Sequence, residues 1–403
     1  MSEMNYILFD DSTWDELLPL TYTRPVSEIR VGILTIREKW ERYLYGKTVW
    51  YCTRPHLQAK FPMTIGADNL FVNGSVIPTA ELMSELEALK QGCALISGNV
   101  VCAIRLDKTQ AERFNPLSIT FKEYTPQISA CIRITRLTDI FTMNGDAIEH
   151  DFRVLTKGRK SQKLSSSNRV VGNGDVFVEH GAVVECAILN TTNGPIYIGK
   201  NSEIMEGSIV RGPFALCPNS TVKMGAKIYG PTTIGPNSKV GGEVNNVVIL
   251  ANSNKGHDGF IGNAVIGEWC NLGADTNCSN LKNDYSEVRQ WNYPAGRFVK
   301  TGLQFCGLVM GDHSKTSINT MFNTGTVVGV ATNIFGDGFP RNFVPSFAWG
   351  GAAGFSVCTV EKACQIAERV TARRNITFSD VDKKILADVF KLSAKHRAGF
   401  SSK

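Results

Sequence analysis

Aliphatic residues recur at every sixth position through the middle of the chain. The unbroken part of this series is Ile198, Ile204, Val210, Leu216, Val222, Ile228, Ile234 and Val240. A second series, four places later, consists mostly of small residues: Ser202, Ser208, Phe214, Ser220, Ala226, Thr232, Ser238 and Val244. A six-residue period matches neither a helix nor an amphipathic strand. It is typical of hexapeptide repeats, so we predict a parallel β-helix with the aliphatic series pointing inward.

The repeat has clear limits and two interruptions. It begins near Val178, breaks at residues 245–259 and again at 276–307, and ends in the stretch FGDGFPRNFVPSFAWGG. We therefore assign residues 166–350 to the β-helix domain. A solenoid by itself can be a scaffold without chemistry, so any activity is expected from the interruptions.

The chain before the repeat, residues 1–165, lacks the six-residue period and alternates between strand and helix patterns. Strands are expected at residues 6–9, 49–52, 69–72 and 98–104, and helices at 31–45 and 80–90. This alternation predicts an α/β domain with an open, largely parallel sheet, whose ligands bind at the carboxyl ends of the strands. The polar stretch Lys157–Asn168 is expected to be the linker; the alternative is a basic loop that contacts phosphate.

Two helices are predicted in the C-terminal tail, residues 351–403. One spans residues 360–374, and Ser379 is the expected N-cap of the other, with Ile385, Val389 and Leu392 on its apolar face. Basic residues of the first helix either bind the phosphates of coenzyme A or form a solvated face: Arg369, Arg373 and Arg374.

Composition narrows the class of protein. The 403 residues contain no run of about 18 apolar residues and no basic-then-apolar N-terminus. The 11 cysteines form no CxxC pair, so we expect reduced thiols in a cytoplasmic protein. The net charge of +6 is mild, and no basic cluster alternates with aromatics as in nucleic-acid-binding proteins.

The candidate chemistry lies in the interruptions. The first carries Lys255-Gly256-His257-Asp258-Gly259, where glycines permit a tight turn and the histidine can act as a general base. The alternative is an ordinary exposed histidine. The second follows Asn271 and contains Asn280, which either bind a ligand or satisfy turn backbone groups. His313 is a further candidate base.

The segment KGHDGFIGNAVIGEWCNLGADTNCSN resembles the acetyltransfer site of the bifunctional N-acetylglucosamine-1-phosphate uridylyltransferase/glucosamine-1-phosphate acetyltransferase family. The resemblance covers roughly residues 175–335. It implies that His257 is the base, that Asn271 and Asn280 contact the sugar phosphate, and that Ala274 lines the acetyl-CoA site. It also implies a left-handed β-helix and a homotrimer.

The chain departs from this family at three phosphate-contacting positions. The family's tyrosine, lysine and arginine are replaced here by Phe260, Asn245 and Cys217. Three residues are candidates to replace those contacts: Lys255, Lys282 and Tyr285.

The stretch from Leu18 to Pro25 resembles the segment after the nucleotide loop in the uridylyltransferase half of the same family. The glycine-rich loop is absent, and Val26 and Ser75 stand where a lysine and a metal-binding aspartate are expected. A nucleotidyl site here would use Arg24, Arg30 and Asn73, with Asp10 and Asp11 as ligands of Mg²⁺.

The resemblance implies two activities. The β-helix would transfer acetyl from acetyl-CoA to glucosamine 1-phosphate, and the first domain would join N-acetylglucosamine 1-phosphate to UTP, giving UDP-N-acetylglucosamine. One alternative is a single acetyltransferase, acting on another amino sugar or sugar nucleotide, whose first domain is not catalytic. The other is a non-enzymatic β-helix scaffold.

Overall fold

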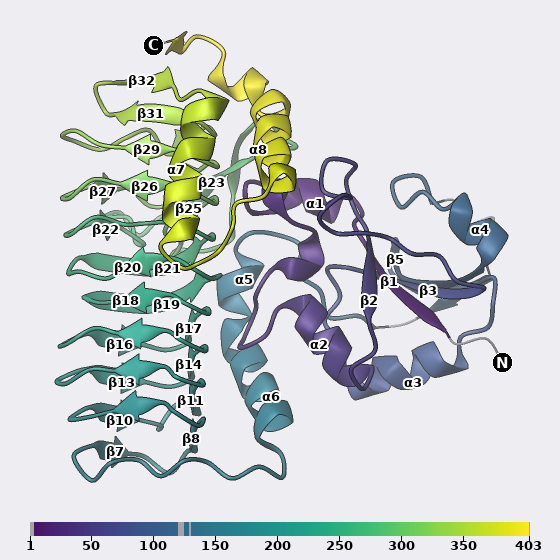
Figure 1. Ribbon diagram of the computed structural model, residues 1–403, viewed down its shortest axis with the longest axis horizontal. Helices are drawn as coiled ribbons and strands as arrows, with labels where there is room; N and C mark the ends of the chain where they lie inside the picture. Colours follow the sequence, from purple (N-terminus) through teal and green to yellow (C-terminus); the bar gives the residue numbers. More distant parts are fainter. Residues whose placement is uncertain (1–3, 120–124, 129, 403) are drawn as a thin grey trace. The chain divides into compact units, whose positions relative to one another are not determined.

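The computed structural model describes residues 4–119, 125–128 and 130–402, and the chain forms two compact units (Figure 1). We call the first the N-terminal unit; it contains residues 1–17, 23–29 and 34–136. The second, the β-helix unit, contains residues 18–22, 30–33 and 137–403. Two short stretches of the early chain, 18–22 and 30–33, therefore belong with the β-helix.

A six-stranded sheet forms the centre of the N-terminal unit, in the order β2-β1-β3-β5-β4-β6. Its strands are β1 (Asn5–Phe9), β2 (Val49–Cys52), β3 (Asp68–Asn73), β4 (Cys93–Ser97), β5 (Val100–Asp107) and β6 (Thr125–Ile128). Only β5 runs against its neighbours, while β1 is parallel to β2 and β3, and β4 to β6. The predicted open, largely parallel sheet is confirmed. β4 is missing from the prediction because CALIS and β5 form one apolar stretch broken only by a short turn.

The helices of the N-terminal unit are α1 (Thr13–Glu16), α2 (Ile36–Tyr43), α3 (Ala80–Ala88) and α4 (Lys108–Glu112), with a 3₁₀ turn at Val26–Glu28. A second 3₁₀ turn, Leu20–Thr23, lies mostly in the stretch that belongs to the β-helix unit. α2 begins later than predicted, at Ile36. Its start is fixed by a capping box, in which the Thr35 hydroxyl accepts from the Glu38 N–H and the Glu38 carboxylate accepts from the Thr35 N–H.

The β-helix unit is a stack of coils with three strand-bearing faces (Figure 1). Face A holds β7 (Arg169–Val171), β10 (Ile188–Asn190), β13 (Ile209–Arg211), β16 (Lys227–Tyr229), and the first halves of β19 (Glu243–Ile249) and β21 (Phe260–Ile266). Face B holds β8 (Val176–Val178), β11 (Ile196–Ile198), β14 (Phe214–Leu216), β17 (Thr232–Ile234), the second halves of β19 and β21, β25 (Val309–Met310), β28 (Val327–Val328) and β30 (Phe343–Val344).

Face C is the one that concerns function. It holds β9 (Val183–Val184), β12 (Glu203–Ile204), β15 (Thr221–Val222), β18 (Lys239–Val240), β20 (Asn254–Lys255), β26 (Lys315–Thr316), β29 (Asn333–Ile334) and β31 (Ala348–Gly351). Asn271 bridges β20 and β26, so the ladder continues between them.

The six-residue series forms the core of this solenoid. All eight of its aliphatic residues are at most 1% exposed, and the eight residues of the second series are equally buried. Fully burying one such aliphatic side chain contributes about 1.5–3 kcal/mol. The predicted parallel β-helix with an inward aliphatic series is therefore confirmed as the fold class.

The first interruption is a shortened coil. On face C, Thr221 pairs with Lys239 and Lys239 pairs with Asn254, and the chain between the second pair is shorter than the chain between the first. The lost residues correspond to a corner, because β19 and β21 each run through faces A and B as one long strand. The predicted break at residues 245–259 thus contains regular strand at 245–249 and 254–255, and two turns, at 250–253 and around His257, lie outside the strands.

The second interruption is a true excursion. After β22 (Asn277–Cys278), which pairs with β27 (Met321–Phe322), the chain leaves the solenoid and forms the hairpin β23 (Arg289–Asn292) and β24 (Arg297–Lys300). It returns at β25. The stretch expected to end the solenoid instead adds β30 and β31 to it, and β32 (Gly354–Val357) and β33 (Ser401–Ser402) close the last sheet.

Two helices missing from the prediction pack on the β-helix. α5 (Asp139–Thr142) lies against β19 and β21, and α6 (Asn144–Thr156) against β14 and β17. The Asn144 side-chain oxygen accepts from the Gly32 N–H and the Thr233 hydroxyl, and Asp151 accepts from the Ile33 N–H. These bonds connect residues 30–33 to the solenoid. The predicted domain limit at residue 165 stays a prediction.

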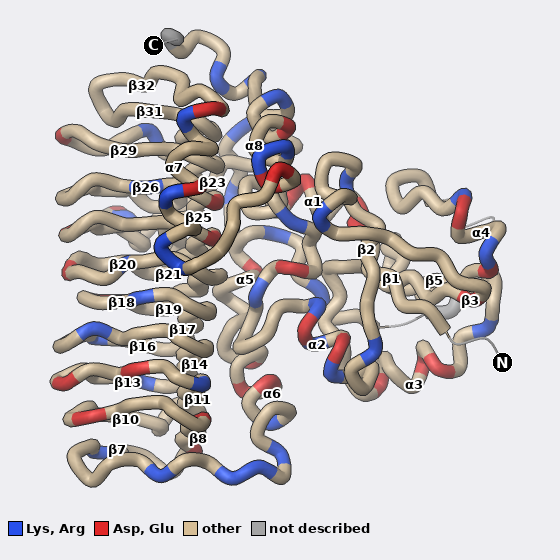
Figure 2. Tube along the Cα trace, viewed as in Figure 1, with Lys and Arg blue, Asp and Glu red and all other residues tan. Residues whose placement is uncertain are grey.

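The expected linker is bonded to the first coils. Arg159 pairs with Glu179 at 2.6 Å, and the Asn168 amide donates to the Val184 carbonyl at 2.7 Å. Its basic residues line the stretch between α6 and β7 in Figure 2.

Both predicted C-terminal helices are present, as α7 (Val360–Ala372) and α8 (Asp380–Leu392), followed by a 3₁₀ turn at Ala394–Arg397. Ser379 caps α8 as predicted, and Ile385 and Val389 are buried. Leu392 is half exposed, so its place on the apolar face is wrong. Among the described helices, none has the length and apolarity needed to cross a membrane.

Candidate functional site

His257 lies on the exposed turn that joins face C to face A. The turn follows β20 and precedes β21. Of the two glycines near His257, only Gly259 requires glycine: its φ is +105°, and an added Cβ would lie 2.4 Å from the Thr276 carbonyl oxygen. Gly256 has ordinary geometry and open space around it.

Lys255 holds this turn from beneath. Its side chain is buried, and its ammonium donates to the carbonyls of His257 at 2.7 Å, Gly241 at 3.0 Å and Asp258 at 3.1 Å. Burial lowers the pKa of Lys255 to about 8, against an opposing effect of nearby Asp258 and Asp275. The structure thus makes Lys255 a support for the turn and places its ammonium away from solvent.

A hollow of about 420 Å³ opens at this corner. It is lined by His257 and Asp258 on one coil, by Ala274 and Asp275 on the next, and by Gly241 and Gly242 on the coil before. The Asp275 N–H donates to the Asp258 carbonyl at 3.1 Å, which ties the two turns together. The predicted base and the predicted acetyl-CoA residue therefore share one site.

The other residues predicted for this site lie elsewhere on the β-helix unit. Asn271 lines a different hollow, at the opposite edge of face C. The Asn280 amide donates to the Asn263 side chain at 2.7 Å. The Lys282 ammonium donates to the Glu287 carbonyl at 2.9 Å, and Tyr285 is two-thirds exposed in the same excursion.

His313, the second candidate base, is at the corner between faces B and C. Its ring stacks on Trp269 with 6.3 Å between centroids and meets Phe378 edge-on at 5.7 Å. Of the three positions that replace family phosphate contacts, Cys217 is buried and its thiol faces the Ile33 carbonyl at 3.5 Å.

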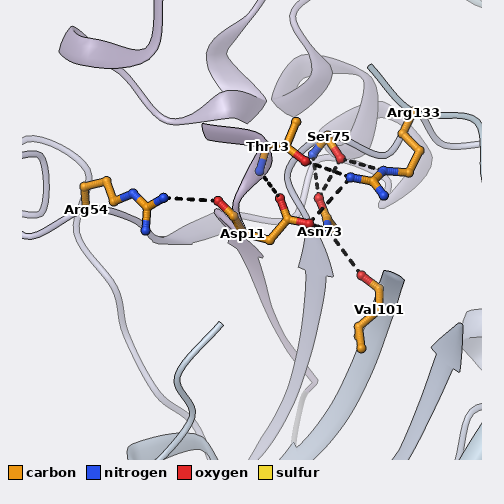
Figure 3. A network of polar contacts seen from close by, with 7 residues as sticks. All are labelled: Asp11, Thr13, Arg54, Asn73, Ser75, Val101 and Arg133. Atoms are coloured by element: carbon orange, nitrogen blue, oxygen red, sulfur yellow. Dashed lines mark hydrogen bonds and ion pairs between the residues drawn. The ribbon is translucent and has the colours of Figure 1, made fainter. Parts of the chain in front are cut away.

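In the N-terminal unit, a polar network lies at the carboxyl ends of β1 and β3 (Figure 3). The Asn73 amide donates to an Asp11 carboxylate oxygen at 2.8 Å and to the Val101 carbonyl at 3.2 Å. Its own oxygen accepts from the Ser75 N–H and hydroxyl. Asn73 is thus bonded on both sides within the network.

Two arginines that the sequence analysis does not include complete this network. Arg133 lies 3.5 Å from Asp11 and donates to the Thr13 and Ser75 hydroxyls at 2.8 and 3.0 Å. Arg54 donates to the Asp11 carbonyl at 3.3 Å and pairs with Asp15 at 2.7 Å. Arg133 lies 120 residues from Thr13 in the sequence, and no local pattern marks it.

Asp10 is buried beside this network. One carboxylate oxygen accepts from the Val26 N–H at 2.9 Å and the other from the Thr53 hydroxyl at 2.5 Å. Burial raises the pKa of Asp10 to about 7, although both hydrogen bonds oppose the shift.

These aspartates do not fit a magnesium site. Mg²⁺ takes carboxylates that leave room for several waters in an octahedral arrangement. Asp10 is enclosed with both oxygens bonded, and Asp11 already faces the Arg133 guanidinium. Within the described residues, no three His, Cys, Asp or Glu side chains are grouped so that they could hold a metal ion.

The two arginines predicted for the nucleotidyl site fall in different units. Arg24 is buried in the N-terminal unit. Arg30 belongs to the β-helix unit, where its guanidinium donates to the carbonyls of Leu250 and Ile33. Arg30 is therefore part of the packing of residues 30–33.

Comparison with known proteins gives matches to sugar nucleotidyltransferases and acetyltransferases, each over part of the chain. Residues 6–160 match the family model described as sugar nucleotidyl transferase. The chain is 34% identical over 87 residues to the bifunctional protein GlmU of Methanocaldococcus jannaschii, over 22% of this chain and 21% of that protein. Over this part of its length the chain is similar to GlmU.

The chain also matches YaiX of Escherichia coli, a putative uncharacterized acetyltransferase by its name, with 32% identity over 154 residues, 38% of this chain and 66% of that protein. Among solved structures, the polySia-specific acetyltransferase NeuO is 16% identical and covers 52% of this chain and 99% of its own, with a TM-score of 0.29. The β-helix fold is defined by the strand pairing and does not depend on this similarity. The chain spans about a fifth of the length of the first curated relatives, the GlmU proteins and their bifunctional homologue.

Proposed function

We propose that the β-helix unit transfers an acetyl group from acetyl-CoA to the amine of glucosamine 1-phosphate. The observation that carries this proposal is the exposed His257 turn, held by three hydrogen bonds from Lys255 and sharing a hollow with Ala274. The partial similarity to GlmU and to YaiX, which is named as a putative acetyltransferase, supports it.

The reaction is a direct transfer. The amine nitrogen of the sugar attacks the thioester carbonyl and gives its proton to the neutral imidazole of His257. The C–S bond then breaks, and the departing thiolate leaves as the free thiol once it takes that proton. We assign the developing negative charge on the carbonyl oxygen to backbone N–H groups near Ala274. Packed coils contribute by holding both substrates in place.

The test follows release of free thiol from acetyl-CoA with glucosamine 1-phosphate. We expect His257→Ala to lower the rate by roughly 10²–10⁴-fold, the usual contribution of a general base. His180→Ala, an exposed histidine on the corner of an earlier coil, is the matched control and should behave as wild type. Equal rates in the wild type and His257→Ala would refute the proposed role of His257 as the base.

For the N-terminal unit we propose uridylyl transfer from UTP to N-acetylglucosamine 1-phosphate. The sugar nucleotidyl transferase match over residues 6–160 supports this step. Asp10 and Asp11 do not fit a protein-held Mg²⁺, so no metal-binding role is assigned to them.

Release of pyrophosphate from UTP and N-acetylglucosamine 1-phosphate would test the second activity. Release that persists in His257→Ala would assign it to the N-terminal unit. No release from a protein that still transfers acetyl would leave the single-function alternative. The homotrimer implied by the family is also a proposal, and light scattering should give three times the chain mass.

A further inference from the structure

A second groove, of about 580 Å³, runs along the other edge of face C. Its walls are the corner turns between faces B and C and the last turn of α7. Its lining consists of five asparagines, four basic residues and a few apolar side chains: Asn219, Asn237, Asn252, Asn254, Asn271, Lys239, Lys315, Arg373, Arg374, Trp269, Cys270, Val370 and Ile376. We call this the amide groove.

The amide groove is cationic. Lys239, Lys315, Arg373 and Arg374 line it, and no acidic side chain is found among the described residues of its lining. Figure 2 shows the basic C-terminal end of α7 beside the strands. Four positive charges without a neighbouring carboxylate in this lining favour an anionic ligand.

Two of these cations are partly withdrawn from water. The Arg374 guanidinium donates to the Asn237 carbonyl at 2.8 Å and the Asn254 side chain at 3.1 Å, and lies 5.8 Å from the Trp269 ring centre. Lys315 donates to the His313 carbonyl at 2.8 Å. Burial lowers the pKa of both, so an anion in the groove would stabilise their charged forms.

The asparagines are positioned by the repeat itself. Asn219, Asn237 and Asn252 occupy the same corner in successive coils, with φ of +59°, +57° and +55°. Asparagine tolerates this left-handed conformation better than most residues. The corner thus presents a row of amides, which suit the hydroxyl and phosphate oxygens of a sugar or nucleotide.

The amide groove and the His257 hollow flank the same strands. Asn254 lines the groove and His257, three residues later, lines the hollow; Asn271 and Ala274 repeat this arrangement on the next coil. Three residues of extended chain span about 10 Å. One elongated ligand can therefore reach from the groove to the turn.

We propose that the amide groove binds the phosphate groups of a nucleotide whose reactive end lies at His257. This inference rests on the proposed acetyl transfer. A single sugar phosphate fits poorly, because its phosphate is too close to its amine to bridge the groove and the turn, and it cannot engage four cations. The same chemistry has two sources: the 3′-phosphorylated ADP of coenzyme A, or the diphosphate of a nucleotide-sugar acceptor.

The test measures binding of adenosine 3′,5′-bisphosphate and of UDP by calorimetry, using the full chain. We expect one of them to bind, and the double variant Lys239→Met/Arg373→Met to weaken it about tenfold or more. Both side chains are exposed, so the fold should survive. Lys227→Met, at an exposed position of face A outside the lining of the groove, is the control and should bind as wild type.

Tighter binding of the bisphosphate assigns the groove to coenzyme A, and tighter binding of UDP assigns it to a nucleotide-sugar acceptor. Binding of neither, or equal binding by wild type and double variant, overturns the inference. His257→Ala should bind the nucleotide unchanged. The wild type could bind the nucleotide without transferring acetyl, and the double variant could lose that binding. This result would support the amide groove as a nucleotide site and refute the proposed acetyl transfer.

Discussion

Lys255 in the β-helix unit and Asp10 in the N-terminal unit are buried groups whose pKa values are moved toward neutrality, and the two groups serve different ends. Burial lowers the pKa of Lys255 to about 8 and raises that of Asp10 to about 7. Lys255 directs its three hydrogen bonds to the backbone of a turn and leaves His257 exposed on it. Asp10 bonds inward, to Val26 and Thr53.

The surroundings extend this contrast. Around His257 the side chains face a hollow, whereas in the N-terminal unit Asp11, Asn73 and Arg133 bond to one another (Figure 3). A buried ionisable group can thus hold a turn that exposes a functional side chain, as Lys255 does, or bond only within the protein interior, as Asp10 does. The hollow beside His257 is open, whereas the polar side chains of the N-terminal network are bonded to one another.

The largest effect should come from removing the Lys255 ammonium. Lys255→Met leaves three carbonyls without their donor, at a cost of roughly 2 kcal/mol in the free energy of unfolding. Acetyl transfer should fall more, by about 100-fold, because a displaced base loses its geometry. Denaturant unfolding and thiol release measure the two effects.

Lys227→Met, at an exposed position of face A, is the control and should change neither quantity. The titration adds a second check. Because the folded-state pKa of Lys255 is depressed from 10.5 to about 8, stability should rise with pH between those values, and this rise should be absent in Lys255→Met. An unchanged rate of thiol release in Lys255→Met would show that Lys255 does not position His257, and the contrast between Lys255 and Asp10 would fail.

The repeat and the candidate base could be predicted, because each rests on a local signal. Every coil needs an aliphatic side chain at the same inward position, so the series that begins at Ile198 recurs every six residues. The Gly-His turn is likewise visible in the short stretch from Lys255 to Gly259. The role of Lys255 depends on carbonyls of its own coil and of Gly241, 14 residues earlier.

What the sequence leaves open is pairing over long distances. Arg133 meets Thr13 across 120 residues, and Arg374 meets Asn254 across another 120. The amide groove is hidden for the same reason. Its asparagines look like ordinary turn residues until α7 is folded against them.

A middle-sized effect is expected at Asp10. Its pKa is raised from 3.8 to about 7, so its contribution to stability is present below pH 3.8 and is lost as the pH rises through 7. Asp10→Asn keeps an acceptor for the Val26 N–H without the charge. At pH 8 we expect the variant to be more stable than wild type by roughly 2 kcal/mol.

Thermal unfolding at pH 5 and pH 8 measures this difference, and Glu87→Gln, exposed on α3, is the control. If Asp10→Asn lost stability at pH 8, the carboxylate would be needed in its charged form. Asp10 would then resemble Lys255 as a buried group whose charged form the structure needs, and the contrast between the units would weaken.

The smallest effect tests whether the network of Figure 3 is closed. Arg133→Met and Asp11→Asn should each destabilise the N-terminal unit, and the double variant should be less unstable than their sum by about 1 kcal/mol. That coupling follows because each variant removes the same ion pair and leaves its partner without compensation. Denaturant unfolding of the four proteins gives the cycle.

The same four proteins decide what the network is for. If it serves only the fold, UTP should raise the melting temperature equally in wild type and Arg133→Met, or in neither. If instead the coupling is near zero and UTP stabilises wild type alone, Arg133 binds the nucleotide. The N-terminal unit would then open its network for a ligand, whereas the β-helix unit keeps its turn exposed without one.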